Sequence, residues 1–155
     1  MTGTMLRVVL VHPQIPPNTG NIARTCAATG TPLHLIEPLG FRIDDRHLKR
    51  AGIDYWPHVK VTVHPNLEQF AQVAKGRWVC FDTNGTHHLR QYAYQPGDWL
   101  LFGCESDGLP PDLTRQHPTV YIPMAQTAVR SLNLSVSVAI ALYEARRQLG
   151  LDAGK

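Results

Sequence analysis

The sequence predicts an α/β domain with a mostly parallel sheet flanked by helices. Short apolar runs alternate with helix-like stretches along its 155 residues, which is the pattern of parallel α/β proteins. Several runs are too uniformly apolar for a sheet with one face in solvent, which indicates strands whose two faces are both covered. Because 43% of the residues are hydrophobic, we expect one packed core and a single domain over residues 1–155.

Six short runs are the strand candidates, because they combine strand length with β-branched, aromatic and other apolar residues. They are Leu6–Val11, Leu33–Ile36, Val59–Val63, Trp78–Phe81, Trp99–Phe102 and Thr119–Ile122. In an open parallel sheet, ligands bind beyond the carboxyl ends of the strands. The loops that follow these runs are therefore the first places to look for a site.

The first helix is expected from about Thr19 to Thr29. Pro16 and Pro17 resist helix, Asn18 can cap the first turn, and Gly30 can end the helix. The last helix is expected from about Leu134 to Leu149.

The first half of the last helix is apolar on nearly every side. Such a helix needs cover on more than one side. Its own sheet and a second subunit are equally good candidates for that cover. We expect residues 1–4 to be a disordered leader and residues 151–155 to be a tail.

Composition excludes several classes of protein. The longest apolar run, Val136–Tyr143, is too short to cross a bilayer, and no signal peptide pattern opens the chain, so we expect a soluble cytoplasmic protein without a membrane partner. The net charge of +3 permits a polyanionic partner but does not demand one. Neither the eight histidines nor Cys26, Cys80 and Cys104 have metal-ligand spacing. We therefore expect buried thiols and no metal site.

Residues 16–24 form the first segment with potential chemistry. Asn18, Gly20 and Asn21 make a polar turn at the mouth of a helix, and Arg24 follows one turn later. An arginine at that place can reach an anion held near the helix N-terminus. A capped helix with a surface arginine explains the same residues equally well.

Residues 100–110 form the second segment, a buried strand that breaks into a loop containing Gly103, Glu105 and Gly108. Glycines let the backbone approach a ligand closely. An ordinary strand-to-helix turn is the simpler explanation of this segment when it is taken alone.

Residues 120–137 form the third segment. Ser131, Asn133 and Ser135 lie where a loop becomes an apolar helix. Helix capping accounts for one of these side chains but not for the whole cluster. A polar ligand or a buried chain crossing is therefore the hypothesis for the cluster.

Together, the three segments resemble the signature motifs of the SPOUT RNA methyltransferases, in particular the family of minimal tRNA wobble-ribose methyltransferases. The resemblance covers residues 5–150 and includes the runs Ile15–Asn21, Ile36–Phe41 and Arg50–Tyr55 in the expected order. It implies an α/β fold with a deep C-terminal trefoil knot, which no pattern argument predicts.

The resemblance also implies an activity: transfer of a methyl group from S-adenosyl-L-methionine (SAM), leaving S-adenosyl-L-homocysteine. The acceptor would be the ribose 2′-hydroxyl of the wobble nucleotide, a cytidine or carboxymethylaminomethyluridine at position 34 of leucine tRNAs. The implied assembly is a homodimer that packs through its first and last helices.

Functional residues follow from the resemblance by position. The cofactor pocket would involve Phe81, Thr83, Gly103, Ile122, Ser131 and Leu132, largely through their backbones. Arg24 would be essential, with Glu105 and Asn133 holding the arginine or the ribose. Because a guanidinium loses its proton only above a pKa of about 12, Arg24 fits substrate positioning and charge stabilisation better than the role of general base. The group that accepts the proton stays open.

The resemblance also implies RNA contacts. Most of them would be to phosphates and would therefore act regardless of base sequence. The candidates are Asn18, Asn21, Arg46, Lys49, Arg50, Arg130 and Tyr143. Tyrosine on an apolar helix is more often a core residue. An anticodon loop suits such a protein because its unstacked nucleotides expose their 2′-hydroxyls.

Three alternatives remain. A dinucleotide-binding fold would use Glu37 to hold a ribose, but the turn at His12–Pro17 lacks the required glycines, and its prolines remove backbone donors. A non-catalytic RNA-binding protein could keep the same fold. A methyltransferase of this class could also act on another tRNA position or on ribosomal RNA.

Overall fold

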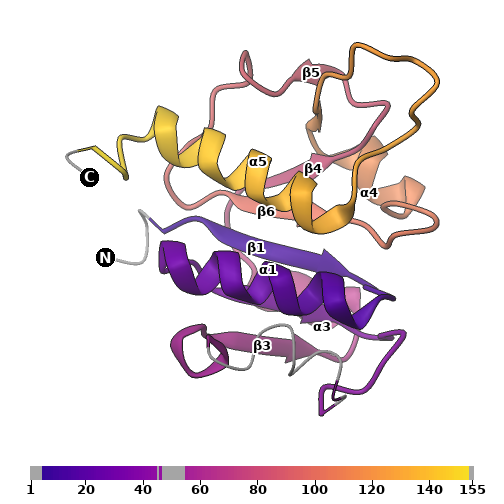
Figure 1. Cartoon of the computed structure of the whole chain (residues 1–155), viewed down its shortest axis with the longest axis vertical. Helices are drawn as coiled ribbons and strands as arrows, with labels where there is room; N and C mark the ends of the chain where they lie inside the picture. Colours follow the sequence, from indigo (N-terminus) through magenta and orange to yellow (C-terminus); the bar gives the residue numbers. More distant parts are fainter. Residues whose placement is uncertain (1–4, 45, 47–54, 154–155) are drawn as a thin grey trace.

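The structure is a computed structural model, and it describes residues 5–153 apart from residue 45 and residues 47–54. Its strands form one seven-stranded sheet in the order β3-β2-β1-β6-β4-β7-β5 (Figure 1). Every strand pairing is parallel. The predicted α/β class with a parallel sheet is therefore confirmed.

The strands lie close to their predicted positions. Their bounds are β1 Arg7–Val11, β2 Leu33–Ile36, β3 Val61–His64, β4 Trp78–Phe81, β5 His87–His88, β6 Trp99–Phe102 and β7 Thr119–Tyr121. The third strand begins at Val61 rather than at Val59. The strand at β5 was not predicted, because two histidines carry no apolar pattern.

The helices include three that the sequence pattern missed. Their bounds are α1 Pro16–Thr29, the 3₁₀ helix η2 Trp56–His58, α3 Leu67–Val73, α4 Pro111–Gln116 and α5 Leu134–Gln148. The missed helices are short, so they show too few turns for an apolar periodicity to be recognised.

The sheet is covered on both faces. Figure 1 shows α1 and α5 side by side on one face, with α3 and α4 behind the sheet. Side chains of β1 alternate between two cores: Val8 and Leu10 pack with the α1–α5 side, whereas Val9 and Val11 pack with Phe70 of α3. This arrangement explains why the strand is apolar at all four positions after Arg7.

The first helix begins earlier than predicted, at Pro16. Pro16 and Pro17 occupy its first turn, where their missing N–H groups would have no helical partner anyway. Ile15 is the N-cap residue and makes no side-chain cap, so the expectation that Asn18 caps this helix is wrong. Gly30 ends the helix with φ 64°, as predicted.

The last helix, α5, lies where it was predicted. Val138, Ala141 and Leu142 are buried on its inner side, against α1 and the sheet. Val136 and Tyr143 remain 46% and 49% exposed on the outer side. No helix of the described residues is long and apolar enough to cross a membrane. The C-terminal knot implied by the resemblance stays a prediction.

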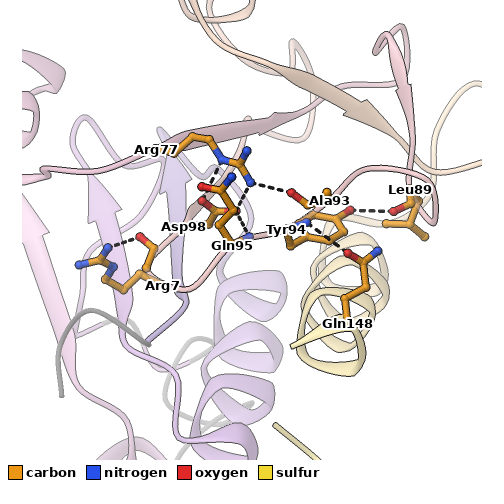
Figure 2. Close-up of polar contacts among 9 residues, drawn as sticks. Arg7, Arg77, Leu89, Ala93, Tyr94, Gln95, Asp98 and Gln148 are labelled. Atoms are coloured by element: carbon orange, nitrogen blue, oxygen red, sulfur yellow. Dashed lines mark hydrogen bonds and ion pairs between the residues drawn. The ribbon is translucent and has the colours of Figure 1, made fainter. Parts of the chain in front are cut away.

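A polar network fixes the edge of the sheet where the strands begin (Figure 2). The Asp98 carboxylate, 1% exposed, accepts hydrogen bonds from Arg77 Nε at 3.0 Å, Arg77 Nη2 at 2.7 Å and the Gln95 backbone N–H at 2.8 Å. Nearby, the Tyr94 backbone N–H donates to Oε1 of Gln148 at 3.1 Å. These contacts join the chain before β4 and β6 to the end of α5.

Candidate active site

A cavity of about 540 Å³ opens beyond the carboxyl ends of β4, β6 and β7. Its walls come from residues 81–84, 102–108 and 120–137 and from the start of α1. This is the edge of a parallel sheet at which ligands are expected. The second and third segments singled out in the sequence thus form most of one concave site.

All six residues predicted for the cofactor pocket line this cavity. They are Phe81, Thr83, Gly103, Ile122, Ser131 and Leu132. The rings of Phe81 and Phe102 stack in its wall, with centroids 4.7 Å apart and planes 7° apart. Both rings are nearly buried in the core, so the bottom of the cavity is apolar and the loops around it are polar.

Gly103 is required by the loop that forms the second wall. A Cβ atom at this position would lie 2.0 Å from the carbonyl carbon of Gly108 and 2.2 Å from the backbone nitrogen of Leu109. The loop folds back so tightly that Cys104 and Gly108 form an isolated antiparallel bridge. Gly108 completes the turn at φ 70°. The absence of a side chain at Gly103 therefore allows the loop to fold into the wall of the cavity.

The Glu105 carboxylate binds the start of α1 from this loop. It accepts hydrogen bonds from the backbone N–H groups of Gln14 at 2.8 Å and Ile15 at 2.9 Å, and from Nδ2 of Asn18 at 3.2 Å. A negative charge at a helix N-terminus also interacts favourably with the helix dipole. Glu105 therefore supplies the cap that no local side chain of α1 provides.

Asn18 extends this network to α5. Its Oδ1 accepts a hydrogen bond from Nδ2 of Asn133 at 3.1 Å. Asn133 is the N-cap of α5, and its Oδ1 accepts from the backbone N–H of Ser135 at 2.9 Å and from the Ser135 hydroxyl at 2.6 Å. Asn18 is 8% exposed and both ends of its amide are engaged. This geometry favours a structural link over the predicted RNA contact.

Arg24 lies outside the cavity of its own chain. It is exposed on α1, and its guanidinium carbon lies 4.8 Å from the centroid of the Tyr55 ring. Glu105 and Asn133 contact Asn18 instead, so within one chain they do not hold the arginine. Asn21 is also exposed on α1 and lies outside the cavity lining.

The other predicted RNA-contacting residues are dispersed. Arg130 is exposed and lines the cavity, whereas Arg46 and Tyr143 are exposed elsewhere on the surface. Lys49 and Arg50 lie outside the described residues. Among the basic candidates that the structure describes, Arg130 lines the cavity and Arg46 does not.

Several lining residues were not predicted as site residues. Asp82, Asn84, Ser106, Asp107 and Met124 all line the cavity. Asp82 and Asn84 flank Thr83 directly after β4, so their position beyond a strand end was the available signal. The Asp82 carboxylate is partly used within its own loop, because it accepts from the backbone N–H of Asn84 at 3.2 Å.

The cysteines and acidic residues do not assemble a metal centre in the described part of the chain. Cys26 and Cys80 are buried, and burial raises the pKa of each thiol to about 12. Cys104 is half-buried at the cavity, so the expectation of buried thiols is wrong for this residue. Glu37 is exposed and does not line the cavity, which speaks against the dinucleotide-binding alternative.

The chain is similar to known proteins over nearly its whole length. The chain is 55% identical over 151 residues to a protein of Synechocystis sp., and the alignment covers 94% of this chain and 97% of the relative. It is 46% identical over 150 residues to the tRNA (cytidine(34)-2'-O)-methyltransferase of Escherichia coli, covering 94% of this chain and 95% of that protein.

Solved structures show the same architecture. One that concerns 2-OH methylation of C/U34 on tRNA has a TM-score of 0.91 and 49% identity, covering 96% of this chain and 98% of that chain. The AdoMet-bound rRNA methyltransferase of Sinorhizobium meliloti has a TM-score of 0.84 and 30% identity, covering 94% of this chain and 57% of that chain. Residues 5–143 match the family model described as SpoU rRNA Methylase. The chain therefore belongs to the SpoU rRNA Methylase family.

Proposed function

We propose that this chain is a SAM-dependent methyltransferase that methylates the ribose 2′-hydroxyl of nucleotide 34 in tRNA. The observation that carries the proposal is the cavity beyond β4, β6 and β7, in which all six expected cofactor residues gather. The relative from Escherichia coli, named for this reaction, supports the choice of substrate. Leucine tRNAs are the proposed substrates within this class, and the cytoplasm is the proposed compartment.

The residues around the cavity fit SAM. A volume of about 540 Å³ falls within the range of roughly 300–1,000 Å³ typical of small-molecule pockets. The apolar lining residues Ile122 and Leu132 suit a base, whereas Asp82 and Ser131 suit the polar groups of a ribose and an amino acid. When bound, SAM supplies an electrophilic methyl group on a sulfonium.

The polar network shapes the cavity before any ligand arrives. Glu105, Asn18 and Asn133 join the loop after β6 to the starts of α1 and α5. Each of these side chains makes at least two hydrogen bonds within the protein, so the network resists rearrangement. A site held in one geometry spends little free energy on reorganisation during the reaction.

Arg24 is the residue proposed to stabilise the 2′-oxygen as it loses its proton. It does not line its own cavity, so the complete site needs the arginine of a second copy. The proposed homodimer packs through α1 and α5, where Val136 and Tyr143 are half-exposed on the outer side of α5. A guanidinium suits this role because it stays charged and presents several N–H donors.

The RNA would cross the cavity mouth with its backbone against basic side chains. Arg130 lines the cavity and is exposed, so it can contact a phosphate beside the target nucleotide. Arg46, Lys49 and Arg50 are proposed to contact phosphates further away. Asn21 and Tyr143 remain weaker candidates for RNA contacts, because neither lines the cavity.

The decisive experiment is transfer of labelled methyl from SAM to tRNA that lacks this modification, followed by nuclease mapping. We expect the label in the 2′-O-methyl nucleotide at position 34 and its loss in Arg24→Ala. Arg115→Ala is the matched control, because Arg115 is an exposed arginine on α4 outside the cavity. Label in ribosomal RNA or at another tRNA position would reject the substrate; absence of SAM binding in calorimetry would reject the reaction.

Subunit mixing tests the shared site. Arg24→Ala removes the arginine that one subunit would contribute. Gly103→Val disrupts the cavity, because the new side chain overlaps with the backbone of its own loop. A heterodimer of the two inactive chains keeps one complete site only if the arginine of one subunit serves the cavity of the other. We expect activity to return on co-expression. If the mixture stays as inactive as its parents, Arg24 does not act across the interface.

A further inference from the structure

Tyr55 contacts Arg24 through the face of its ring. The guanidinium carbon lies 4.8 Å from the ring centroid, well inside the limit of about 6 Å for a cation–π contact. Tyr55 is half-buried and Arg24 is exposed, so the contact lies on the outer side of the domain, against α1.

The Tyr55 backbone is held in place by the core. Tyr55 is the N-cap of η2, and its carbonyl accepts a hydrogen bond from the His58 backbone N–H at 2.8 Å. The flanking residues Trp56 and Val59 pack against the core that α1 and α5 share, and η2 also contacts α1. The ring therefore stands on a fixed support beside the arginine.

An aromatic ring holds a guanidinium differently from a carboxylate. A carboxylate would occupy the N–H donors of Arg24 and neutralise its charge. A ring face restrains the guanidinium through its quadrupole and leaves the in-plane donors free. An arginine that has to stabilise a developing negative charge on a substrate oxygen needs this second kind of support.

We propose that Tyr55 is a positioning residue for Arg24, holding the guanidinium by its ring face so that the N–H donors stay available to the RNA substrate. This inference rests on the proposed function, because it assigns Tyr55 a part in presenting the arginine that the reaction uses. Its energetic scale is that of an exposed cation–π contact, which corresponds to about two- to fivefold in rate.

The test replaces Tyr55 by rings of equal shape and decreasing quadrupole: phenylalanine, then 3,5-difluoro- and 3,4,5-trifluorophenylalanine. Tyr55→Leu removes the ring. We expect Tyr55→Phe to keep the wild-type kcat and the fluorinated series to lower kcat progressively, by about two- to fivefold in total. The Kd for SAM should stay unchanged, because the ring is outside the cavity, and the melting temperature should fall by at most about 4 °C.

A spectroscopic measurement follows the contact without using activity. The Nε–Hε resonance of Arg24 should carry a ring-current shift that disappears in Tyr55→Leu and persists in Tyr55→Phe. The inference is overturned if this shift is absent in the wild type, or if kcat is independent of fluorination. Failure of the wild-type chain to methylate any tRNA would instead overturn the proposed function, which separates the two outcomes.

Discussion

The two ends of the sheet each hold a carboxylate that ties loops together, but they satisfy it in different ways. Asp98, where the strands begin, is paired with the Arg77 guanidinium (Figure 2). Glu105, where the strands end, binds backbone N–H groups and the Asn18 amide. At the first end a carboxylate is paired with a guanidinium, whereas at the second end Arg130 lines the cavity without a carboxylate partner among the described residues.

This difference separates stability from function. An internal ion pair at a buried position matters mainly for folding, because removal of one partner leaves the other unsatisfied. A carboxylate that holds the start of a helix and the wall of a cavity matters for geometry as well. The variants below should therefore change stability most at one end of the sheet and methyl transfer most at the other.

The largest effect on stability is expected from Asp98→Ala. It leaves Arg77 without its carboxylate and removes the acceptor of the Gln95 backbone N–H. We expect the free energy of unfolding to fall by about 3 kcal/mol, as measured by urea denaturation. Asp112→Ala is the matched control, since its exposed pair with Arg115 is worth little. A loss as small as that of the control would show that the network is not structural.

Glu105→Gln should reduce stability only slightly and methyl transfer strongly. The variant keeps one acceptor for the start of α1 but loses the charge, so stability should fall by only about 1 kcal/mol. Displacement of the cavity wall should lower kcat by about 10- to 100-fold, because small shifts of positioning groups are costly. Single-turnover methyl transfer beside thermal melting measures both quantities. A large loss of thermal stability with little change in kcat would contradict the proposal that the end of the sheet with the cavity serves function more than stability.

The architecture was largely predictable because its signals are local. The runs at β4 and β6 are apolar over their whole length, the run at β2 is apolar apart from His34, and the observed bounds of all three coincide with the predicted ones. The short helices and β5 were missed because contacts with distant parts of the fold, such as η2 with α1 and β5 with β7, support them rather than their own sequence. The start of α1 was missed because Glu105, far away in the sequence, supplies its cap.

The candidate site was predictable in position but not in its contacts. The resemblance gathered Phe81, Gly103 and Ser131 correctly around one cavity, although their contact with a cofactor stays a prediction. The link from Glu105 through Asn18 spans distant segments, which no spacing rule encodes. Pattern alone therefore read Asn18 as a cap.

A smaller effect on stability is expected from pH, through two histidines on the face of the sheet opposite to α1 and α5. His34 Nδ1 lies 2.9 Å from His64 Nε2, and the rings stack beside Phe70. Burial, with the nearby charges of His64, Arg7 and Lys60, lowers the pKa of His34 from 6.5 to about 4. Between these values the unfolded chain takes up a proton that folded His34 does not bind. Stability should therefore fall as the pH drops from about 6.5 to about 4.

We expect this loss to amount to about 1–2 kcal/mol, after allowance for the part of the ring that solvent reaches. Denaturation at a series of pH values measures it, with His34→Gln as the non-titrating comparison. The variant should show a flatter pH dependence in this window, because it lacks the titrating ring at position 34; a His64→Gln variant measures the part that comes from the neighbouring histidine. An unchanged slope would mean that His34 ionises normally in the folded state.

The smallest effect is expected at the far end of the cavity network, in Ser135→Ala. The Ser135 hydroxyl donates to Asn133 Oδ1 at 2.6 Å, but that oxygen also accepts the Ser135 backbone N–H at 2.9 Å. Asn133 thus keeps both its cap and its bond to Asn18. We expect a stability loss of about 0.5 kcal/mol and a change in kcat below about threefold. A loss comparable to that of Glu105→Gln would place the critical contact of the network at α5 rather than at α1.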